Sequence, residues 1–497
     1  MAHWLITGGE WILIIVVLAA ALPELAGAWQ FLLAACHGWR NHYADCAPAF
    51  PRTAVLIPAW NEGAVIGASI DRLMAADYPS QSLRVYVVDD ASTDDTPRLA
   101  RQKEAQYPGR VVHLRRDKGG QGKARTLNHG LAAVLDDDWM QALLITDADV
   151  IFEPATLRTM ARHLADPAVG AVTAYIKEGS RPGNYLTRFI SYEYVTAQAG
   201  ARRGQNVLGA IACLAGGAQL HSRANLIALG GRIDATSLAE DTFTTFETQL
   251  RGHRVVFEPH AVCWAEEPGS IASLWKQRLR WARGNVQVTA RYRRLWFRRG
   301  AGHGLGGLTF GLLWFCLLLQ PVFMITSSAA LLTLYFAGSP DVWPAFRVLW
   351  ITNAATYVFI TGFTLLIDPG TARRAWRQAL LFPGLVNLAI IAYSCFPRPL
   401  RDGAREAFAA AHLAPPRAGW VMAFVYAWLG ASLAVAYLAK LAGPRRAGRL
   451  LGALLVYVAG YGTLLCACTF ASYVKELRRA EMSWDKTEKT GKVAIPK

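Results

Sequence analysis

Two kinds of hydrophobic pattern occur in this chain of 497 residues. From about Arg52 to Pro268, short apolar runs rich in β-branched residues alternate with helical stretches. Near-continuous apolar runs of this length are typical of buried strands in a parallel sheet that is covered on both faces. Three such runs are Thr53–Pro58, Val85–Asp89 and Ala142–Asp147. This part of the chain is therefore predicted to be a soluble α/β domain.

Longer apolar runs flank this domain. The first, Trp11–Leu33, exceeds a signal-peptide core and has no basic segment before it, so we expect a retained membrane helix with a kink near Pro23 and Glu24. Five more follow, at 305–336, 342–367, 379–396, 419–441 and 450–473. All but the third are long enough to cross a bilayer. The third is short, contains Pro383 and is flanked by arginines, which favours a re-entrant or interfacial segment.

About five spans follow from this pattern, with the α/β domain and the C-terminus on the cytoplasmic side. The loop Pro444–Arg446 then lies outside, against the usual placement of positive charge. Lys276–Arg299 contains nine Lys or Arg residues and no acid. This predicts amphipathic helices in the headgroup plane, and the alternative is a solvated basic face. The predicted parts are a transmembrane helix (1–45), the α/β domain (46–268), interface helices (269–303), a transmembrane region (304–473) and a cytoplasmic tail (474–497).

Composition supports a membrane-associated class. Hydrophobic residues make up 53% of the chain, charged residues make up 18%, and the formal net charge is +16. Because many of the cations flank apolar segments, they indicate contact with membrane lipid, and no signature of nucleic-acid binding is present. None of the eight cysteines forms a Cys-x-x-Cys pair, so we expect reduced thiols, with neither a disulfide framework nor a zinc site.

Polar residues follow each predicted strand directly. The first strand leads into Pro58, Asn61 and Glu62, the second into Asp90, and the third into Asp147-Ala148-Asp149. Ligands of open α/β sheets bind beyond the carboxyl ends of the strands, so these groups are expected to converge on one crevice. Asp90 is expected to accept hydrogen bonds from a nucleoside, and a helix N-cap or turn is the alternative.

The two carboxylates of Asp147 and Asp149 can share a hard cation, Mg²⁺ or Mn²⁺, with phosphate oxygens completing its shell. An isolated Asp-x-Asp is more often part of a loop. The glycine-rich stretch Lys118–Lys123 lacks the spacing of a Walker A loop. It lets Lys123 and the backbone approach a nucleotide sugar, or else it is a flexible loop.

Glu240 and Asp241 open a predicted helix. A carboxylate at a helix N-terminus that faces the crevice can deprotonate an acceptor hydroxyl, and capping of the helix by Asp241 is the alternative. Gln277, Arg280 and Trp281 share one face of a later helix through their i, i+3, i+4 spacing. The first two can hold a diphosphate and Trp281 can stack on a sugar, whereas the alternative is an Arg/Trp stripe at the membrane interface.

The order of these motifs resembles that of the family 2 inverting glycosyltransferases. The motifs lie at 58–62, 89–94, 147–149, 239–241 and 277–281. Within the family, the chain is similar to the membrane-integrated processive synthases of cellulose, hyaluronan, chitin oligomers and poly-N-acetylglucosamine. Leu274–Ala282 and Phe257–Pro259 are most similar to the poly-N-acetylglucosamine synthases. The resemblance covers about Arg52 to Val288 and the general membrane layout.

The resemblance implies a GT-A fold, which is a Rossmann-like mixed α/β sheet, combined with an α-helical transmembrane region. It implies a nucleotide-sugar donor, usually UDP-linked, and Mg²⁺ or Mn²⁺. Asp241 would be the base with Glu240 beside it, and the growing polysaccharide would cross a bacterial inner membrane. A small accessory membrane subunit or a periplasmic export partner would fit such a synthase. One departure is Ala239, where many members have Thr, which removes a hydroxyl beside the catalytic carboxylates.

Residues Ser483–Lys489 resemble the Trp-x-Lys-Thr tails of related synthases. This implies a gating role for Trp484, Thr487 and Lys489, and the alternative is a disordered polar tail. Two other functions remain open. A transferase of one sugar to a lipid carries a variant of the Gln-x-x-Arg-Trp motif, and a receptor or scaffold with a decayed transferase domain is disfavoured because every acidic motif is retained.

Overall fold

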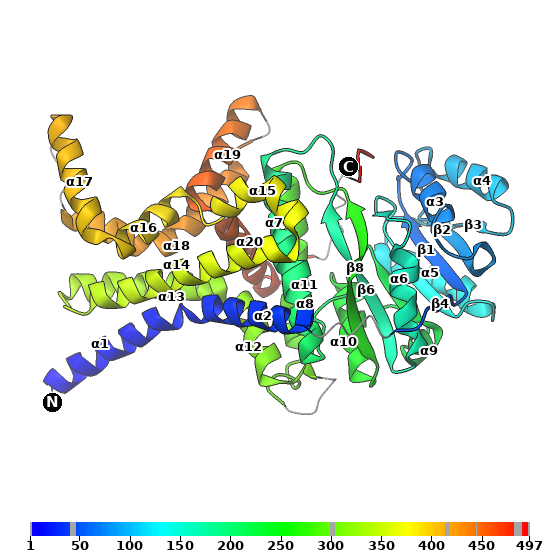
Figure 1. The fold of residues 1–497 in the computed structure, drawn as a ribbon, viewed down its shortest axis with the longest axis horizontal. Helices are drawn as coiled ribbons and strands as arrows, with labels where there is room; N and C mark the ends of the chain where they lie inside the picture. Colours follow the sequence, from blue (N-terminus) through cyan, green and yellow to red (C-terminus); the bar gives the residue numbers. More distant parts are fainter. Residues whose placement is uncertain are drawn as a thin grey trace. The chain divides into compact units, whose positions relative to one another are not determined.

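The structure is a computed structural model that describes residues 2–39, 46–298, 304–412, 418–443, 445–481 and 490–495. It divides into two compact units (Figure 1). The first unit, Met1–Trp29 with Leu312–Arg478, is helical. The second, Gln30–Gly311 with Arg479–Lys497, contains the sheet. The end of the chain therefore belongs to the unit that carries the α/β fold.

An eight-stranded sheet forms the centre of the second unit, in the order β3-β2-β1-β4-β7-β6-β8-β5. Strands β3, β2, β1 and β4 pair in parallel, as do β6 and β8, whereas β7 and β5 run antiparallel to their neighbours. The strands are β1 Thr53–Ala59, β2 Leu83–Asp89, β3 Val111–Arg115, β4 Ala142–Ile145, β5 Ile151–Phe152, β6 Val169–Glu178, β7 Gln219–Ser222 and β8 Arg254–Ala265. The three strands predicted from the sequence are thus confirmed as β1, β2 and β4.

Both faces of the sheet are covered, which explains the continuous apolar pattern of its strands. Leu56 of β1 packs with Leu127 and Leu131 of α5, and its neighbours Val55 and Ile57 are equally buried. The helices of this unit are α3 Ile66–Met74, α4 Thr96–Gln106, α5 Lys123–Asp136, α6 Thr156–Ala161, α7 Tyr185–Tyr194, α8 Ala201–Leu208, α9 Arg223–Ala228, α10 Glu240–Leu250 and α11 Ile271–Arg291. A π-helical turn, Val195–Gly200, joins α7 to α8.

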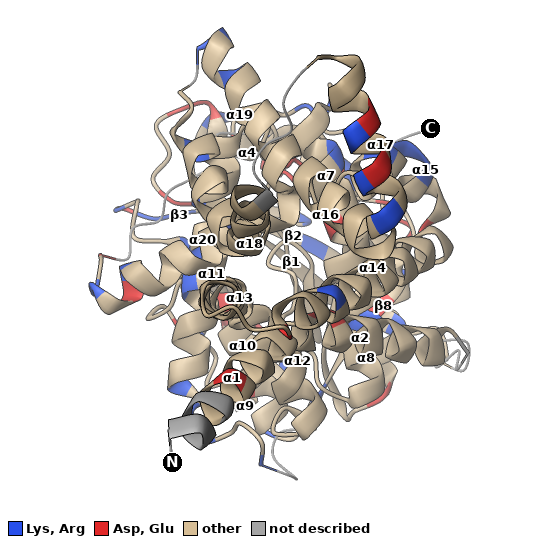
Figure 2. Ribbon diagram, turned by 90° about the vertical axis from the view of Figure 1, so that its left-hand side faces the viewer, with Lys and Arg blue, Asp and Glu red and all other residues tan. Residues whose placement is uncertain are grey.

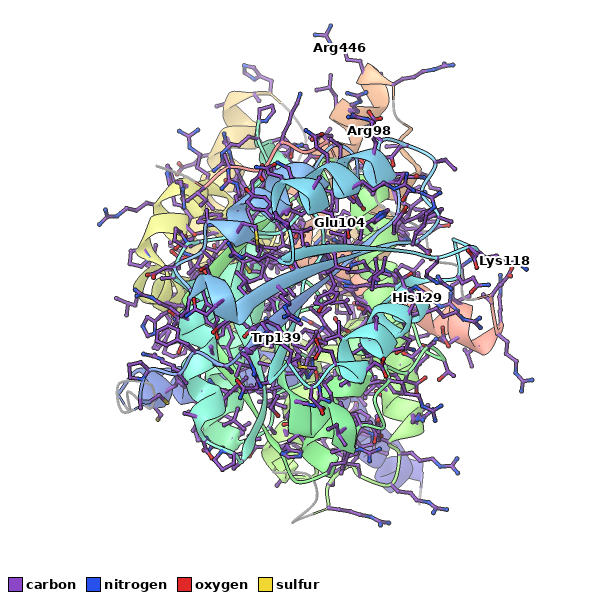
Figure 3. The ribbon with its side chains drawn as sticks, turned by 90° about the vertical axis from the view of Figure 1, so that its right-hand side faces the viewer. Arg98, Glu104, Lys118, His129, Trp139 and Arg446 are labelled. Atoms are coloured by element: carbon purple, nitrogen blue, oxygen red, sulfur yellow. The ribbon has the colours of Figure 1, made fainter. Side chains whose placement is uncertain are left out.

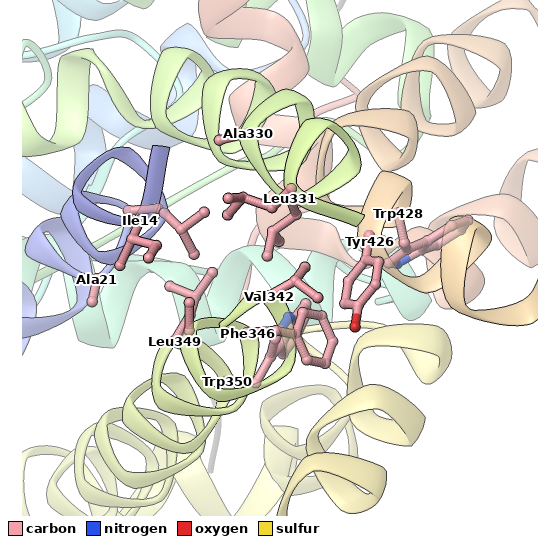
Figure 4. Close-up of a cluster of buried hydrophobic side chains, with 14 of the residues drawn as sticks. Ile14, Ala21, Ala330, Leu331, Val342, Phe346, Leu349, Trp350, Tyr426 and Trp428 are labelled. Carbon is pink, nitrogen blue, oxygen red and sulfur yellow. The ribbon is translucent and has the colours of Figure 1, made fainter. Parts of the chain in front are cut away.

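The helical unit has its own hydrophobic core. Aromatic and aliphatic side chains of α1, α13, α14 and α18 meet there, among them Phe346, Trp350, Leu331 and Tyr426 (Figure 4). The helices are α1 Ala2–Ala19, α2 Leu22–Trp39, α12 Leu308–Leu318, α13 Gln320–Phe336, α14 Val342–Ile367, α15 Pro369–Leu380, α16 Leu385–Cys395, α17 Pro397–Ala410, α18 Ala418–Leu441, α19 Arg446–Ala459 and α20 Tyr461–Leu477. Helix α2 continues from this unit into the second.

Three helical segments are long and apolar enough to cross a membrane, namely Gly8–Gly38, Val342–Ile367 and Gly419–Leu441. Three helix pairs pass the same test together but bend between partners, by 66° for α12 and α13, 77° for α15 and α16, and 98° for α19 and α20. The described residues therefore hold between three and six candidate spans. Helix α13 contains no charged residue, whereas α17 contains residues of both charges (Figure 2).

Two of these bends pack backbone against backbone. Gly384 and Gly460 have φ values of 93° and 98°, and a Cβ on either would overlap the backbone at the other bend. The Asn387 amide donates to the carbonyl oxygen of Pro383 at 2.6 Å and accepts from Trp428 at 2.8 Å. A backbone carbonyl at the bend is thus paired within the protein, as an apolar environment requires.

Candidate active site

The loops that follow β1 and β2 are tied together by hydrogen bonds. The backbone amide of Asn61 donates to Ser92 Oγ, and Asn61 Oδ1 accepts from the amide of Thr93, both at 2.9 Å. The amide of Glu62 donates to Thr96 Oγ1 at 2.8 Å. Asn61 has a φ of 54°, a left-handed conformation that Asn tolerates better than most residues. The predicted donor residues Asn61 and Glu62 therefore lie in a loop that is held in shape.

The neighbouring acids at the end of β2 have different surroundings. Asp89 is fully buried and pairs with Arg115 at 2.8 Å. Asp90, which is also buried, pairs with Arg116 and accepts from the amide of Gly120 at 2.9 Å. Helix α4 begins only after this turn, so Asp90 is not its N-cap. Asp90 thus links the end of β2 to the glycine-rich loop.

Lys123 lies at the centre of the acidic groups. Its ammonium is 2.5 Å from Asp147 Oδ1 and 3.9 Å from Glu240 Oε1, and it donates to the carbonyl oxygen of Gly216 at 3.0 Å. Burial alone would lower the pKa of Lys123, but the carboxylates outweigh this effect and raise it. Lys118, at the other end of the glycine-rich stretch, is exposed at the outer margin of the domain (Figure 3).

Glu240 and Asp241 open α10, as predicted. Glu240 is 5% exposed, and burial, assisted by the charge of Asp241, raises its pKa to about 7 against the opposing effect of Lys123 and Arg280. Arg280 of α11 therefore lies close enough to act on this carboxylate. The helix has its N-cap at Ala239 without a side-chain cap, so Asp241 is not the capping residue.

A glycine pair that the sequence analysis did not single out lies against these carboxylates. A Cβ on Gly216 would be 3.1 Å from Asp241 Oδ2 and 3.4 Å from Lys123 Nζ, and one on Gly217 would be 3.4 Å from Asp147 Oδ2. The missing side chains leave room beside the acids. The signal was present, because adjacent glycines mark a close approach of the backbone to another group.

Asp147 and Asp149 lie in one turn after β4, where the amide of Val150 donates to the carbonyl oxygen of Asp147 at 3.2 Å. The Asp147 side chain is 39% exposed, whereas Asp149 is buried. Among the described residues, no three His, Cys, Asp or Glu are placed to hold a metal ion. Carboxylates are the ligands that hard cations prefer, and part of the Asp147 side chain is accessible to one, while its Oδ1 is paired with Lys123.

Helix α11 carries the three motif residues predicted on it. Gln277 donates to Glu267 at 3.4 Å, Arg280 is half-buried, and the Trp281 side chain is 37% exposed. Glu267 also accepts from the hydroxyl of Tyr194 at 2.6 Å. The indole is thus exposed, and Gln277 is held in place by Glu267.

Arg278 is a structural residue of the motif that sequence reasoning missed. It is buried, pairs with both carboxylate oxygens of Glu193 at 3.0 and 2.8 Å, and lies 4.1 Å from the ring centre of Trp281. It also hydrogen-bonds to Gln277. One arginine among many basic residues gives no signal of its partner on a distant helix. Arg278 therefore helps to hold Gln277 and Trp281 in position.

The residues for which a gating role is predicted, Trp484, Thr487 and Lys489, lie outside the described residues. Their role stays a prediction. All eight cysteines are free thiols in the structure.

The chain is similar to known glycosyltransferases over about half of its length. Residues 51–284 match the family described as "Glycosyltransferase like family 2". The "Probable glycosyltransferase YdaM" of Bacillus subtilis is 31% identical over 52% of this chain and 60% of its own length. The "Poly-beta-1,6-N-acetyl-D-glucosamine synthase" of Staphylococcus aureus is 27% identical over 48% of this chain and 55% of its own length. The chain thus spans somewhat more than half of the length of these relatives.

One solved structure is similar over a larger part of the chain. The mannosyltransferase PcManGT of Pyrobaculum calidifontis, solved with GDP-Man and Mn²⁺, matches 74% of this chain and 99% of its own with a TM-score of 0.55 and 26% identity. The expected fold, a GT-A-like mixed sheet with an added helical region, is confirmed.

Proposed function

We propose that this chain, which carries a family 2 glycosyltransferase domain at residues 51–284, is a processive synthase. It transfers sugars from a UDP-linked donor to the end of a growing β-linked polysaccharide. The observation that carries this proposal is the network around Lys123, which brings Asp147 next to Glu240 and Asp241. In this proposal the base Asp241, the ammonium of Lys123 and the turn at Asp147, which suits a diphosphate, line one crevice.

The reaction is an in-line displacement with inversion. Asp241 takes the proton of the acceptor hydroxyl, whose oxygen forms a bond to the anomeric carbon of the donor. The bond between that carbon and the diphosphate breaks, and its electron pair leaves with UDP. Lys123 and Arg280 lie where negative charge develops on the leaving group, and fixed cations there lower the barrier. Trp281 stacks on the acceptor sugar.

Asp147 and Asp149 would hold Mg²⁺ or Mn²⁺. When bound, the cation neutralises part of the diphosphate charge. Asn61, Glu62 and Asp90 hold the nucleoside. Pro58 lies near the end of β1, directly before the loop that carries Asn61 and Glu62. Gln277 and Arg280 contact the diphosphate from α11.

The helical unit supports a membrane location and a path for the polymer. Between three and six candidate spans occur in the described residues, and the similar Staphylococcus aureus protein is named as a polysaccharide synthase. We place the protein in a bacterial inner membrane with its sheet domain in the cytoplasm. A small accessory subunit or a periplasmic export partner would receive the chain, and membrane lipid surrounds the spans.

The test is an incubation of the purified protein with a panel of UDP-sugars and with GDP-mannose, each with Mg²⁺ or Mn²⁺. Nucleotide release identifies the donor, and the product mass identifies the acceptor. A ladder of long chains is expected. One glycolipid species would instead establish transfer of a single sugar to a lipid, and transfer from no donor would contradict the proposed activity.

A further inference from the structure

The described C-terminal residues, Thr490–Ile495, return to the sheet domain as a short extended segment. Val493 bridges Ser180 in antiparallel register just after β6. The amide of Arg181 donates to the carbonyl oxygen of Lys492 at 2.7 Å, and the amide of Ala494 donates to that of Gly179 at 3.0 Å. The segment is therefore paired with the sheet domain through its main chain.

Two buried charges hold the main chain of the C-terminal region. Glu266 is 7% exposed, and its carboxylate accepts from the amide of Thr490 at 2.8 Å, from the hydroxyl of the same residue at 2.9 Å and from the amide of Gly491 at 3.0 Å. Arg283, also buried, donates to the carbonyl oxygens of Ala480 at 2.7 Å and Glu481 at 3.1 Å. Hydrogen bonds to ionised groups are among the strongest in proteins.

These two anchors lie on either side of the motif at 277–281. Glu266 precedes α11 and is the neighbour of Glu267, which accepts from Gln277. Arg283 lies two residues after Trp281 on the helix itself. The C-terminal region is thus bound by the same stretch of chain that carries the diphosphate-binding and acceptor-binding residues of the proposed reaction.

The segment also packs closely against the loop that follows β1. Gly491 has a φ of 74°, and a Cβ there would be 2.8 Å from the carbonyl oxygen of Ala64 and 3.4 Å from a side-chain carbon of Val65. The preceding part of this loop is tied to the turn after β2 through Asn61 and Glu62. The loop is therefore fixed at one end by that turn and at the other by the C-terminal segment.

We propose that residues 490–495 form part of the donor site because they hold the loop after β1 in place. Glu266 is the positioning residue that holds these residues against the loop. The inference rests on the proposed function, because it takes this loop to bind the donor nucleotide. Without the Glu266 carboxylate, the C-terminal segment no longer holds the loop after β1. The nucleotide must then order this loop when it binds, so the affinity for the donor falls. The base and the acceptor side are untouched, so the rate at saturating donor changes little.

The test compares Glu266→Gln and Gly491→Val with Asp138→Asn. The amide nitrogen of Gln cannot accept both sets of N–H donors, and Val at 491 would meet the Ala64 carbonyl. Asp138 is fully exposed and lies outside the donor site, so Asp138→Asn is the control for the loss of a carboxylate. For the first two variants, the donor KM and the Kd for UDP are expected to rise about tenfold or more, with kcat within about threefold of the wild type.

Thermal unfolding of each variant checks that the domain is folded. If a variant does not fold, deletion of residues 490–497 and addition of that peptide in trans replaces it, and the peptide is expected to restore UDP affinity. Equal donor KM and UDP affinity in all variants would overturn the inference while the wild type still transfers sugar. A wild type that neither binds UDP nor transfers sugar would overturn the proposed function and the inference together.

Discussion

The Lys123 ammonium lies between carboxylates, 2.5 Å from Asp147 and 3.9 Å from Glu240. Ionised acids at such short separations repel each other strongly, and an ammonium between them offsets part of that repulsion. Because these acids raise the pKa of Lys123 above its ordinary value, the side chain stays charged at physiological pH. In the proposed complex the donor diphosphate adds negative charge beside Lys123, so the ammonium also stabilises the bound donor.

Replacement of the base is the first test of the mechanism. Asp241→Asn keeps the shape of the side chain and removes the group that accepts the proton, so transfer should fall by about two to four orders of magnitude. The affinity for UDP should stay near that of the wild type. Initial rates of UDP release and a UDP-binding titration measure the two effects. Asp138→Asn, a change at a fully exposed acid, is the control, and normal transfer by the Asp241→Asn variant would remove Asp241 from the role of base.

The pKa of Glu240 predicts how stability depends on pH. Burial raises this pKa from 4.5 to about 7, so the folded protein holds the proton more tightly than the unfolded chain does. Between these values the free energy of unfolding therefore falls as the pH rises. Relative to Glu240→Gln, which carries no such proton, the wild type should lose at most about 3 kcal/mol between pH 4.5 and 7. Melting curves of both proteins measure this, and a difference that is flat or grows with pH contradicts the assignment.

At the scale of elements, the contact between α10 and α11 sets the geometry of the site. A Cβ on Gly284 would overlap that of Ala239, so these two small residues let the helices approach. Ala239 directly precedes Glu240, and Gly284 lies one turn after Arg280. The contact therefore fixes the catalytic carboxylates relative to the arginine. It also gives a physical reason for the small residue at 239.

Enlarging this contact should impair transfer more than folding. Gly284→Ala forces α11 away from α10, and a displacement of about 1 Å at a reacting centre costs up to about a hundredfold in rate. Overpacking should also lower stability by about 1–3 kcal/mol. Gly67→Ala in α3, where the added methyl meets only a lysine side chain at 3.7 Å, is the control and should leave kcat unchanged. A normal kcat for the Gly284→Ala variant would show that the contact does not position Arg280.

The sequence predicted those elements whose pattern is local. Strands β1, β2 and β4 could be predicted because each is a continuous apolar run that ends in polar residues. The start of α10 could be predicted because Glu240 and Asp241 lie directly before a helical stretch, and acids favour the first turn of a helix. The partner of Arg278 could not, because Glu193 lies 85 residues away on α7 and only the folded chain brings the two together. The same holds for Glu266 and the C-terminal segment, 224 residues apart.

At the scale of the whole molecule, the apolar runs of the helical unit were visible in the sequence, but two of their breaks were not predicted. Hydropathy reports how apolar a segment is, whereas a break depends on what the segment packs against. The bend within 379–396 coincides with Pro383, and a re-entrant or interfacial path was predicted there. Pro321 in the first turn of α13 and Gly460 between α19 and α20 are local signals of the other two breaks, but proline and glycine also occur inside membrane helices and so do not by themselves indicate a bend.

The contact between Gly384 and Gly460 predicts a shared dependence of both bends on glycine. Each residue has a backbone conformation that is essentially restricted to glycine and costs other residues about 1–3 kcal/mol, and a methyl group at either position would overlap the other bend. Gly460→Ala and Gly384→Ala should therefore each lower the melting temperature of the detergent-solubilised protein. The double variant should lose less than the sum of the two, because the first change already separates the bends. Gly362→Ala in α14, which has nothing within 4 Å of the added methyl, is the control and should be neutral or stabilising. Full additivity of the two losses would show that the bends are independent.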